Sequence, residues 1–272
     1  METRWLRAGL WVLLATVAAS AAHATPGPTP AVDQSQSTSA LISLGMPSPD
    51  RSWSSRDYER AADLLESLAQ KDPRLLPRQG STTSGAVFAR IVTVSNIEPT
   101  TTIRADVGQE IQFVLGMLPP LNRIMLVYVS ASNPDATFDR ELSELVGMML
   151  QLSVRVLDVA DRFLRALPKD DPRLSARLEG LDQMKGGISE IFSGALDTLS
   201  EREMYREEVL VSLGTVIEKT LPVAISSFTP ATQKEFRLRV SAMAVKESNG
   251  PLGITLKRLA GKLDMTTSAA TP

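Results

Sequence analysis

Apolar residues recur at helical spacing along most of the chain between Trp53 and Leu263. The clearest run covers about 134–167, where one narrow polar stripe crosses an otherwise apolar sequence. A helix with so thin a polar face is surrounded by other helices. The pattern therefore predicts an all-α fold, an irregular multi-helix bundle around a long central helix at about 134–167. The stripe consists of Glu144, Gln151, Arg155, Asp158, Arg162 and Arg165.

Capping and helix-breaking residues divide the pattern into separate helices. Ser54 to Asp57 reads as a capping box, in which the hydroxyl accepts from a first-turn amide and the carboxylate reaches back. Trp53 precedes the box and is expected to pack back on that helix. The helix ends at Asp72-Pro73, because proline disfavours helical geometry in the residue before it. The motif Asp-Pro-Arg-Leu recurs after the 134–167 helix and predicts two similar helix connections.

Proline and glycine pairs predict further breaks. A buried helix over 107–118 is expected to end at Pro119-Pro120, and Gly186-Gly187 is expected to separate helices over 174–184 and 188–199. Residues 86–97 and 121–131 are apolar and leave helix and strand both open, with the neighbouring elements favouring helix for 86–97.

Capping signals also place the later helices. A second capping box at 200–203 predicts a helix that runs to Leu221 and stops at Pro222. Thr229-Pro230 starts another helix. Asn249-Gly250-Pro251 stops that helix, because a residue tolerant of left-handed geometry followed by proline is typical of a helix end.

The first 24 residues carry the three parts of a secretory signal peptide in order. Arg4 and Arg7 form a positive start, an uncharged apolar run covers 8–22, and Ala22-His23-Ala24 fits the small-x-small cleavage pattern. The run is shorter than the roughly 20 residues that span a bilayer, and an uncleaved anchor is the alternative interpretation. The protein is therefore expected to be periplasmic or extracellular.

The composition divides the rest of the chain into three segments. Residues 25–52 are rich in Pro, Ser and Thr, and we expect a flexible, disordered leader because they bury too little apolar surface to offset ordering. Leu41, Ile42 and Leu44 are the leader residues that could dock on the body. Residues 53–263 are expected to form a single helical domain, and 264–272 a disordered tail.

Cleavage after Ala24 removes the only histidine, His23, from a chain without cysteine. The mature protein then lacks a histidine base, a cysteine nucleophile, and the zinc and copper sites built on these residues. Its net charge moves from −2 to about −3 as Glu2, Arg4 and Arg7 leave, without the basic excess of a nucleic-acid binder. Walker A, Gly-x-Ser-x-Gly and EF-hand patterns are absent. We predict no catalytic, cofactor-binding or metal-binding residues.

Carboxylates are the main catalytic chemistry that remains, because paired acids hydrolyse glycosides. The candidates are Asp158 with Asp161, and Glu203 with Glu207 or Glu208. Each aspartate has an arginine four residues on, and the glutamates fill the first turns of a helix, where acids are favourable. Both groups are therefore interpreted as structural.

The Gly80–Gly85 stretch is the one glycine-rich loop that precedes an expected helix, where backbone amides can face an anion. It lacks the lysine of a phosphate-binding loop, and we interpret it as a flexible connection. Ser84 within it has no activating base in view and is interpreted as a turn or helix-cap residue.

Three functions remain, and the first is an exported, non-enzymatic protein that binds another exported protein or serves as a structural scaffold. The second is a membrane-peripheral or membrane-active bundle. It rests on the apolar segments 107–131 and 209–228 and on 251–263, where Lys257, Arg258 and Lys262 lie beside four leucines. For 251–263 we favour docking on the bundle with the lysines in solvent. Glu218, Lys219 and Pro222 favour a core helix for 209–228. The third is a carboxylate-dependent hydrolase.

Overall fold

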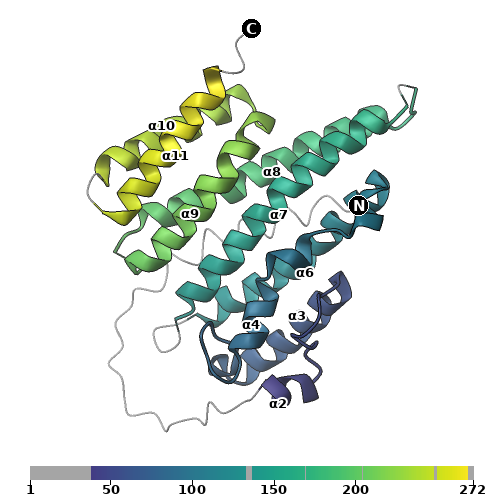
Figure 1. The fold of residues 1–272 in the computed structure, drawn as a ribbon, viewed down its shortest axis with the longest axis vertical. Coiled ribbons are helices and arrows are strands. Elements are labelled where there is room, and N and C mark those ends of the chain that lie inside the picture. The colour runs from purple at the N-terminus through teal and green to yellow at the C-terminus, as the bar shows by residue number, and fades with distance from the viewer. Residues whose placement is uncertain (1–37, 133–136, 169, 204, 248–249, 269–272) are drawn as a thin grey trace. The chain divides into compact units, whose positions relative to one another are not determined.

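The computed structural model describes residues 38–132, 137–168, 170–203, 205–247 and 250–268. All regular elements in these ranges are helices, so the predicted all-α fold is confirmed (Figure 1). The two segments that the sequence left open are helical. Residues 86–97 lie in α4 (Gly85–Ile91) and the 3₁₀ turn η3 (Val94–Ile97), and 121–131 belong to α6 (Val107–Ala131). The predicted signal peptide and His23 lie outside the described residues.

The contacts of the described helices group them into two compact units, and the single domain expected over 53–263 stays a prediction. Unit 1 holds the chain up to Pro99 together with Leu115–Leu145, and unit 2 holds Thr100–Val114 together with the chain from Val146 onward. The helices α6 and α7 (Asp139–Ala166) contribute residues to both units.

Helix α3 (Ser55–Lys71) of unit 1 starts where the sequence predicts. Ser54 is the N-cap and forms a complete capping box with Asp57. Trp53 is 2% exposed and packs edge-to-face on Tyr58, with ring centroids 5.4 Å apart. This apolar contact across the helix start is a hydrophobic staple. The helix ends at Asp72, before the 3₁₀ turn η2 (Pro73–Leu75), which confirms the predicted end.

Residues 38–52 correct the predicted leader of 25–52. They contain helix α2 (Thr38–Ser43), and Leu41 and Met46 are buried. Thr38 donates from Oγ1 to the carbonyl of Thr83. A few apolar side chains inside a polar segment therefore suffice to fix it on unit 1. Residues 25–37 lie outside the described residues.

Helix α6 continues through Pro119 and Pro120, so the break predicted there is wrong. Each proline removes the amide that would bond the carbonyl four residues earlier, here those of Leu115 and Gly116. Both of these residues are exposed, so water can bond their carbonyls. The apolar residues on either side, including Val114, Met117, Leu121 and Ile124, are buried and hold the helix together.

Helix α7 confirms the long apolar helix, although it starts at Asp139 rather than at about 134. Residues 133–136 lie outside the described residues. Leu152, Val156 and Val159 are fully buried, whereas Asp158 and Arg165 from the polar stripe are exposed. The narrow polar face therefore marks the solvent side of the helix.

Three other predicted boundaries are wrong. Helix α8 (Leu174–Ser200) passes through Gly186-Gly187 without a break. Two glycines cost a helix about 2 kcal/mol relative to alanine, which the burial of Leu181, Ile188 and Phe192 on either side can offset. Ser200 ends α8 instead of capping a new helix, and α9 (Glu207–Ala224) begins after an irregular stretch and extends past Pro222.

The last helices of unit 2 are α9, α10 (Pro230–Lys246) and α11 (Pro251–Ser268), with the 3₁₀ turn η4 (Ile225–Ser227) after α9; Figure 1 shows α9, α10 and α11 packed side by side. Thr229 caps α10 by accepting from the amide of Thr232, as predicted. A Cβ on Gly214 would lie 3.2 Å from Leu252, so this glycine sets the close packing of α9 on α11. The tail predicted over 264–272 is wrong for 264–268, which are helical.

Candidate functional site

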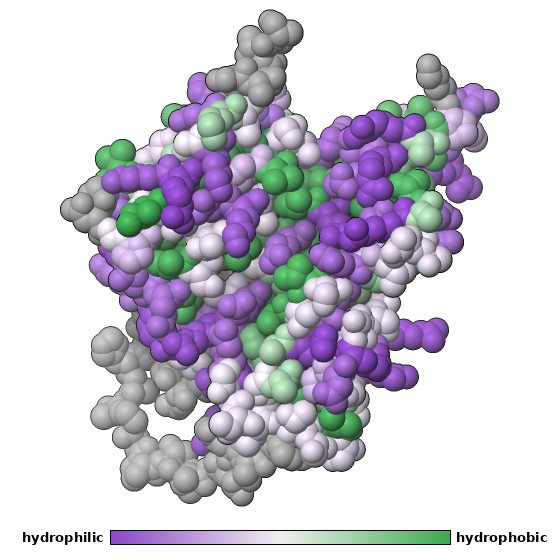
Figure 2. Space-filling model, in the orientation of Figure 1, coloured by the Kyte–Doolittle hydropathy of each residue, from purple (hydrophilic) through white to green (hydrophobic). Residues whose placement is uncertain are grey.

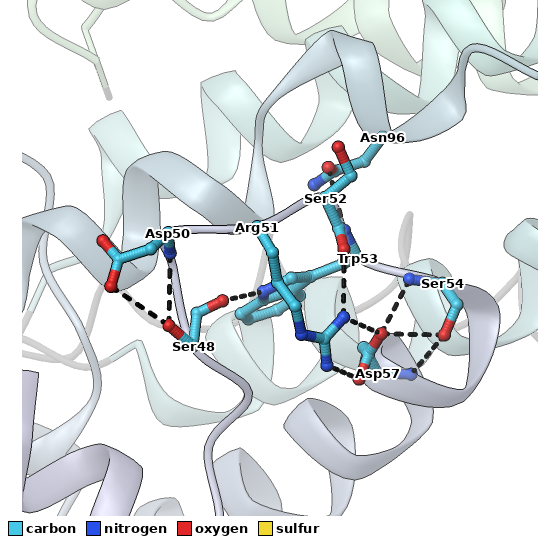
Figure 3. A network of polar contacts seen from close by, with 8 residues as sticks. All are labelled: Ser48, Asp50, Arg51, Ser52, Trp53, Ser54, Asp57 and Asn96. Carbon is cyan, nitrogen blue, oxygen red and sulfur yellow. Dashed lines mark hydrogen bonds and ion pairs between the residues drawn. The ribbon is translucent and has the colours of Figure 1, made fainter. Parts of the chain in front are cut away.

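A network of polar side chains lies at the start of α3 (Figure 3). Arg51 holds Asp57 with two hydrogen bonds, from Nη1 at 2.8 Å and from Nη2 at 2.6 Å. The amide of Ser54 also donates to Asp57, at 2.9 Å. The Arg51 hydrogen bonds hold the pKa of Asp57 well below its ordinary value, against the opposing effect of burial. Asp57 is therefore a structural anion rather than a proton donor.

Asn96 continues this network into the interior of unit 1. Its Oδ1 accepts from the amide of Trp53, and its Nδ2 donates to the hydroxyl of Tyr58 and to the carbonyl of Arg90. Tyr58 in turn donates to the carbonyl of Ile91 at 2.7 Å. Burial raises the pKa of Tyr58, so the phenol stays neutral. The network ties α3 to the end of α4 and to η3.

The Gly80–Gly85 stretch is an ordered turn that uses its own backbone amides. Ser81 Oγ accepts from the amides of Thr83 and Ser84, and the Gly85 amide donates to the Ser81 carbonyl. Ser84 Oγ accepts from the amide of Arg78. Ser84 thus has the turn role that the sequence suggests, and the amides of Ser81, Thr83, Ser84 and Gly85 are engaged within the protein.

A second polar group of unit 1 surrounds this turn. Glu141 is buried and accepts from the amide of Gln79 at 2.7 Å. Tyr128 is fully buried and donates to the carbonyl of Pro77. The guanidinium of Arg78 lies 4.2 Å from the centre of the Phe138 ring. These contacts join α6 and α7 to the loop that follows η2.

The structure does not gather the carboxylates that sequence reasoning considered for catalysis. Asp158 pairs with Arg162 and Asp161 with Arg165, each one helical turn apart on the exposed side of α7. Their predicted pairing is confirmed. Glu203 is exposed in the turn before α9, and Glu207 and Glu208 are exposed in its first turn, where Glu207 is 3.5 Å from Arg202 and Glu208 is 3.5 Å from Arg206.

Sequence reasoning missed the ion-pair cluster between α9 and α11. Glu218 is largely buried and accepts from Arg258 at 2.9 Å and from Lys262 at 2.9 Å. Burial favours the neutral acid, but the hydrogen bonds from these two cations outweigh it and lower the pKa of Glu218. The signal was present as a carboxylate inside an apolar helix and two cations four residues apart on a later helix.

An open surface depression of about 340 Å³ lies at the turn between α7 and α8. Within it Arg177 pairs with Asp171 at 3.4 Å, and Asp171 also accepts from the amide of Arg173. Asp72 accepts from the amide of Arg74 in the same way after α3. The two Asp-Pro-Arg-Leu passages therefore form the same kind of helix connection, as the sequence predicts.

Among the described residues, no three His, Cys, Asp or Glu side chains are grouped so that they could hold a metal ion. Two helices, Val107–Ala131 and Glu207–Ser227, are long and apolar enough to cross a membrane, with mean hydropathies of 1.4 and 1.5. About half of each apolar window is buried within the protein, at 44% and 56%. Core helices pass the same test of length and composition.

No protein-family model, no curated protein and no solved structure matches this chain.

Proposed function

We propose that this protein is exported and works without catalysis, by binding another exported protein or as a structural scaffold. Export rests on the signal-peptide pattern of residues 1–24. The binding or scaffold role rests on a helical body whose polar side chains are used to hold its own elements together.

The bonding of the buried acids is the observation that carries this proposal. Asp57 is held by Arg51, Glu110 by Arg162, and Glu218 by Arg258 and Lys262. An acid catalyst of glycoside hydrolysis needs a raised pKa, whereas the pKa values of Asp57 and Glu218 are lowered. These groups favour a framework over a reaction centre.

Cell fractionation with N-terminal sequencing tests the export step. We expect the protein outside the cytoplasm with a first residue near Thr25, and without His23. A full-length chain recovered from the cytoplasm would contradict export and would restore histidine to the available chemistry.

Cross-linking in the exported fraction tests the binding step. We expect one partner to be recovered in fixed proportion, and the purified partner to bind the purified protein in calorimetry. Hydrolysis of a glycoside by the purified protein, abolished in Asp158→Asn/Asp161→Asn, would overturn the non-enzymatic proposal.

A further inference from the structure

The most exposed large apolar side chains of the described residues all lie on the last three helices. They belong to Val223 of α9, Leu238 and Val245 of α10, and Ile254 and Met265 of α11, with exposures of 60%, 62%, 78%, 56% and 68%. Large apolar residues elsewhere in the described chain reach at most 51%, at Leu44. Single exposed apolar residues are ordinary, so the concentration of these five on three neighbouring helices is what makes this region a candidate interaction surface.

Helical spacing gathers four of these residues into two outward stripes. Leu238 and Val245 are two turns apart on α10, with the exposed Ala242 between them. Ile254 and Met265 are three turns apart on α11. The opposite faces of both helices are buried, through Phe236, Val240 and Met243 on α10 and Leu252, Leu256, Leu259 and Leu263 on α11.

The two stripes belong to one helical hairpin. Helices α10 and α11 are sequential neighbours that pack along their length, and Arg237 donates from Nε to the carbonyl of Leu263. In this antiparallel register Val245 and Ile254 lie at the connected end, and Met265 lies beside the first half of α10. Figure 2 shows apolar patches among polar side chains over this region. The exposed apolar side chains are therefore spread along the hairpin.

The hairpin is basic, although the whole protein is acidic. Residues 230–268 have a net charge of +4 in a chain of net charge −2. Arg258 and Lys262 keep side-chain exposures of 55% and 42% while they hold Glu218, so both still present positive charge to solvent. The charges counted are Lys234, Arg237, Arg239, Lys246, Lys257, Arg258 and Lys262 against Glu235, Glu247 and Asp264.

We propose that this α10–α11 surface, made by Leu238, Val245, Ile254 and Met265 with the surrounding lysines and arginines, docks on an anionic lipid surface. Apolar side chains that enter the headgroup region, surrounded by cations that face anionic lipids, are the features of an interfacial membrane helix. The cores of protein–protein interfaces are instead depleted in lysine. Lipid therefore fits the mixed composition of this surface better than a protein partner does.

The structure assigns this contact to residues other than those the sequence suggests. The leucines of 251–263 are buried against the bundle, so they cannot enter lipid without unfolding. Ile254 and Met265 take their place, and α10 adds a second stripe. This inference does not rest on the protein-binding proposal and can stand or fall alone.

Co-sedimentation with lipid vesicles tests the proposal on the mature chain. At low salt we expect binding to phosphatidylcholine vesicles that contain about a third phosphatidylglycerol, weak binding to pure phosphatidylcholine vesicles, and release as salt screens the charges. Failure to bind the anionic vesicles at low salt would overturn the proposal.

Matched variants distinguish docking through this surface from non-specific hydrophobic adsorption to vesicles. Val245→Ser/Ile254→Ser is expected to weaken vesicle binding about tenfold or more, because two apolar side chains no longer enter the lipid. Leu178→Ser, at an apolar position of α8 that is 46% exposed, is expected to bind as the unmodified protein does. Equal losses in both variants, with unchanged circular dichroism, would contradict the assignment.

Discussion

The start of α3 in unit 1 and the α10–α11 surface in unit 2 use charged residues in opposite ways. In unit 1 the side chain of Asp57 is only 6% exposed, and its ion pair and hydrogen bonds fix a helix start and the segment before it. On α11 the cations Arg258 and Lys262 remain accessible to solvent while the leucines behind them hold the helix in place. The polar contacts at the start of α3 thus serve the backbone of unit 1, whereas Arg258 and Lys262 in unit 2 still face solvent while they hold the buried Glu218.

The difference follows from the length of the helices. Unit 1 joins short elements such as α2, α4 and η3 through irregular segments, whose backbone groups need side-chain partners. Asn96 and Tyr58 supply these partners. Unit 2 packs long helices whose backbones are satisfied internally, so apolar burial supplies most of its stability. The following predictions test this contrast, from the largest expected effect to the smallest.

Truncating a buried side chain on the packed face of α11 is expected to lower the free energy of unfolding most. Leu256→Ala removes a fully buried side chain and should lower the free energy of unfolding by about 2–5 kcal/mol. Urea unfolding followed by far-ultraviolet circular dichroism measures this loss. A loss below about 1 kcal/mol would mean that apolar burial on α11 does not hold unit 2 together.

Breaking the Asp57 network should rank second. Asp57→Asn removes a charged hydrogen-bond partner of Arg51 and weakens the capping box, with an expected loss of about 2–3 kcal/mol. Trp53 is the only tryptophan outside the predicted signal peptide and packs beside this site, so its fluorescence reports unfolding there in a chain that starts at residue 25. Asp63→Asn on the same helix is the control. The Asp63 side chain is 68% exposed, so this substitution should lower the free energy of unfolding by less than about 1 kcal/mol.

The Asp57 contribution should also depend on pH. Its pKa is lower in the folded protein than in the unfolded chain, so the stabilisation is complete above the unfolded value of about 4 and is lost as pH falls below it. The stability difference between the unmodified protein and Asp57→Asn should therefore be constant from pH 7 to 5 and shrink in stronger acid. A difference that grows on acidification would contradict the lowered pKa.

Neutralising Glu218 should have a smaller effect than neutralising Asp57. Glu218→Gln keeps the shape of the side chain but removes the charge that holds Arg258 and Lys262, with an expected loss of about 1 kcal/mol. Both cations can turn to solvent, because their side chains are 55% and 42% exposed. Thermal unfolding compares the two variants, and a loss as large as that of Asp57→Asn would remove the contrast between the regions.

Removing the Asp158 charge should have the smallest effect. Asp158→Asn breaks an exposed ion pair between residues one helical turn apart on α7. We expect the free energy of unfolding to fall by about 0.3–0.5 kcal/mol, and by less at high salt. Thermal unfolding at low and high salt checks this. A change above about 1 kcal/mol would show that the aspartate has a buried or catalytic role.

Local chemistry predicted the elements that depend on local contacts. The capping box at Ser54, the cap at Thr229 and both Asp-Pro-Arg-Leu turns are made by residues within a few positions of one another. The helix breaks expected at Pro119-Pro120 and Gly186-Gly187 do not occur, because contacts with distant parts of the chain decide the structure there. Tertiary burial on both sides of each pair outweighs a local penalty that the sequence pattern treats as decisive.

The polar network and the exposed surface could not be predicted from spacing. Trp53 and Tyr58 meet Asn96 from about forty positions away, and no periodicity identifies such a partner. The sequence predicted that the segment 251–263 docks on the bundle, and its buried leucines confirm this. The outward positions of Ile254 and Met265 were not predicted. The fold also shows that Leu238 and Val245 on α10 face outward.

Hydrogen–deuterium exchange in the presence and absence of anionic vesicles tests most directly the claim that the protein acts through the α10–α11 surface. The account predicts slower exchange in 230–246 and 251–268 when vesicles are present, and unchanged exchange around Asp57 and Asn96. Exchange that is unaltered in α10 and α11, or slowed equally in both regions, would contradict it.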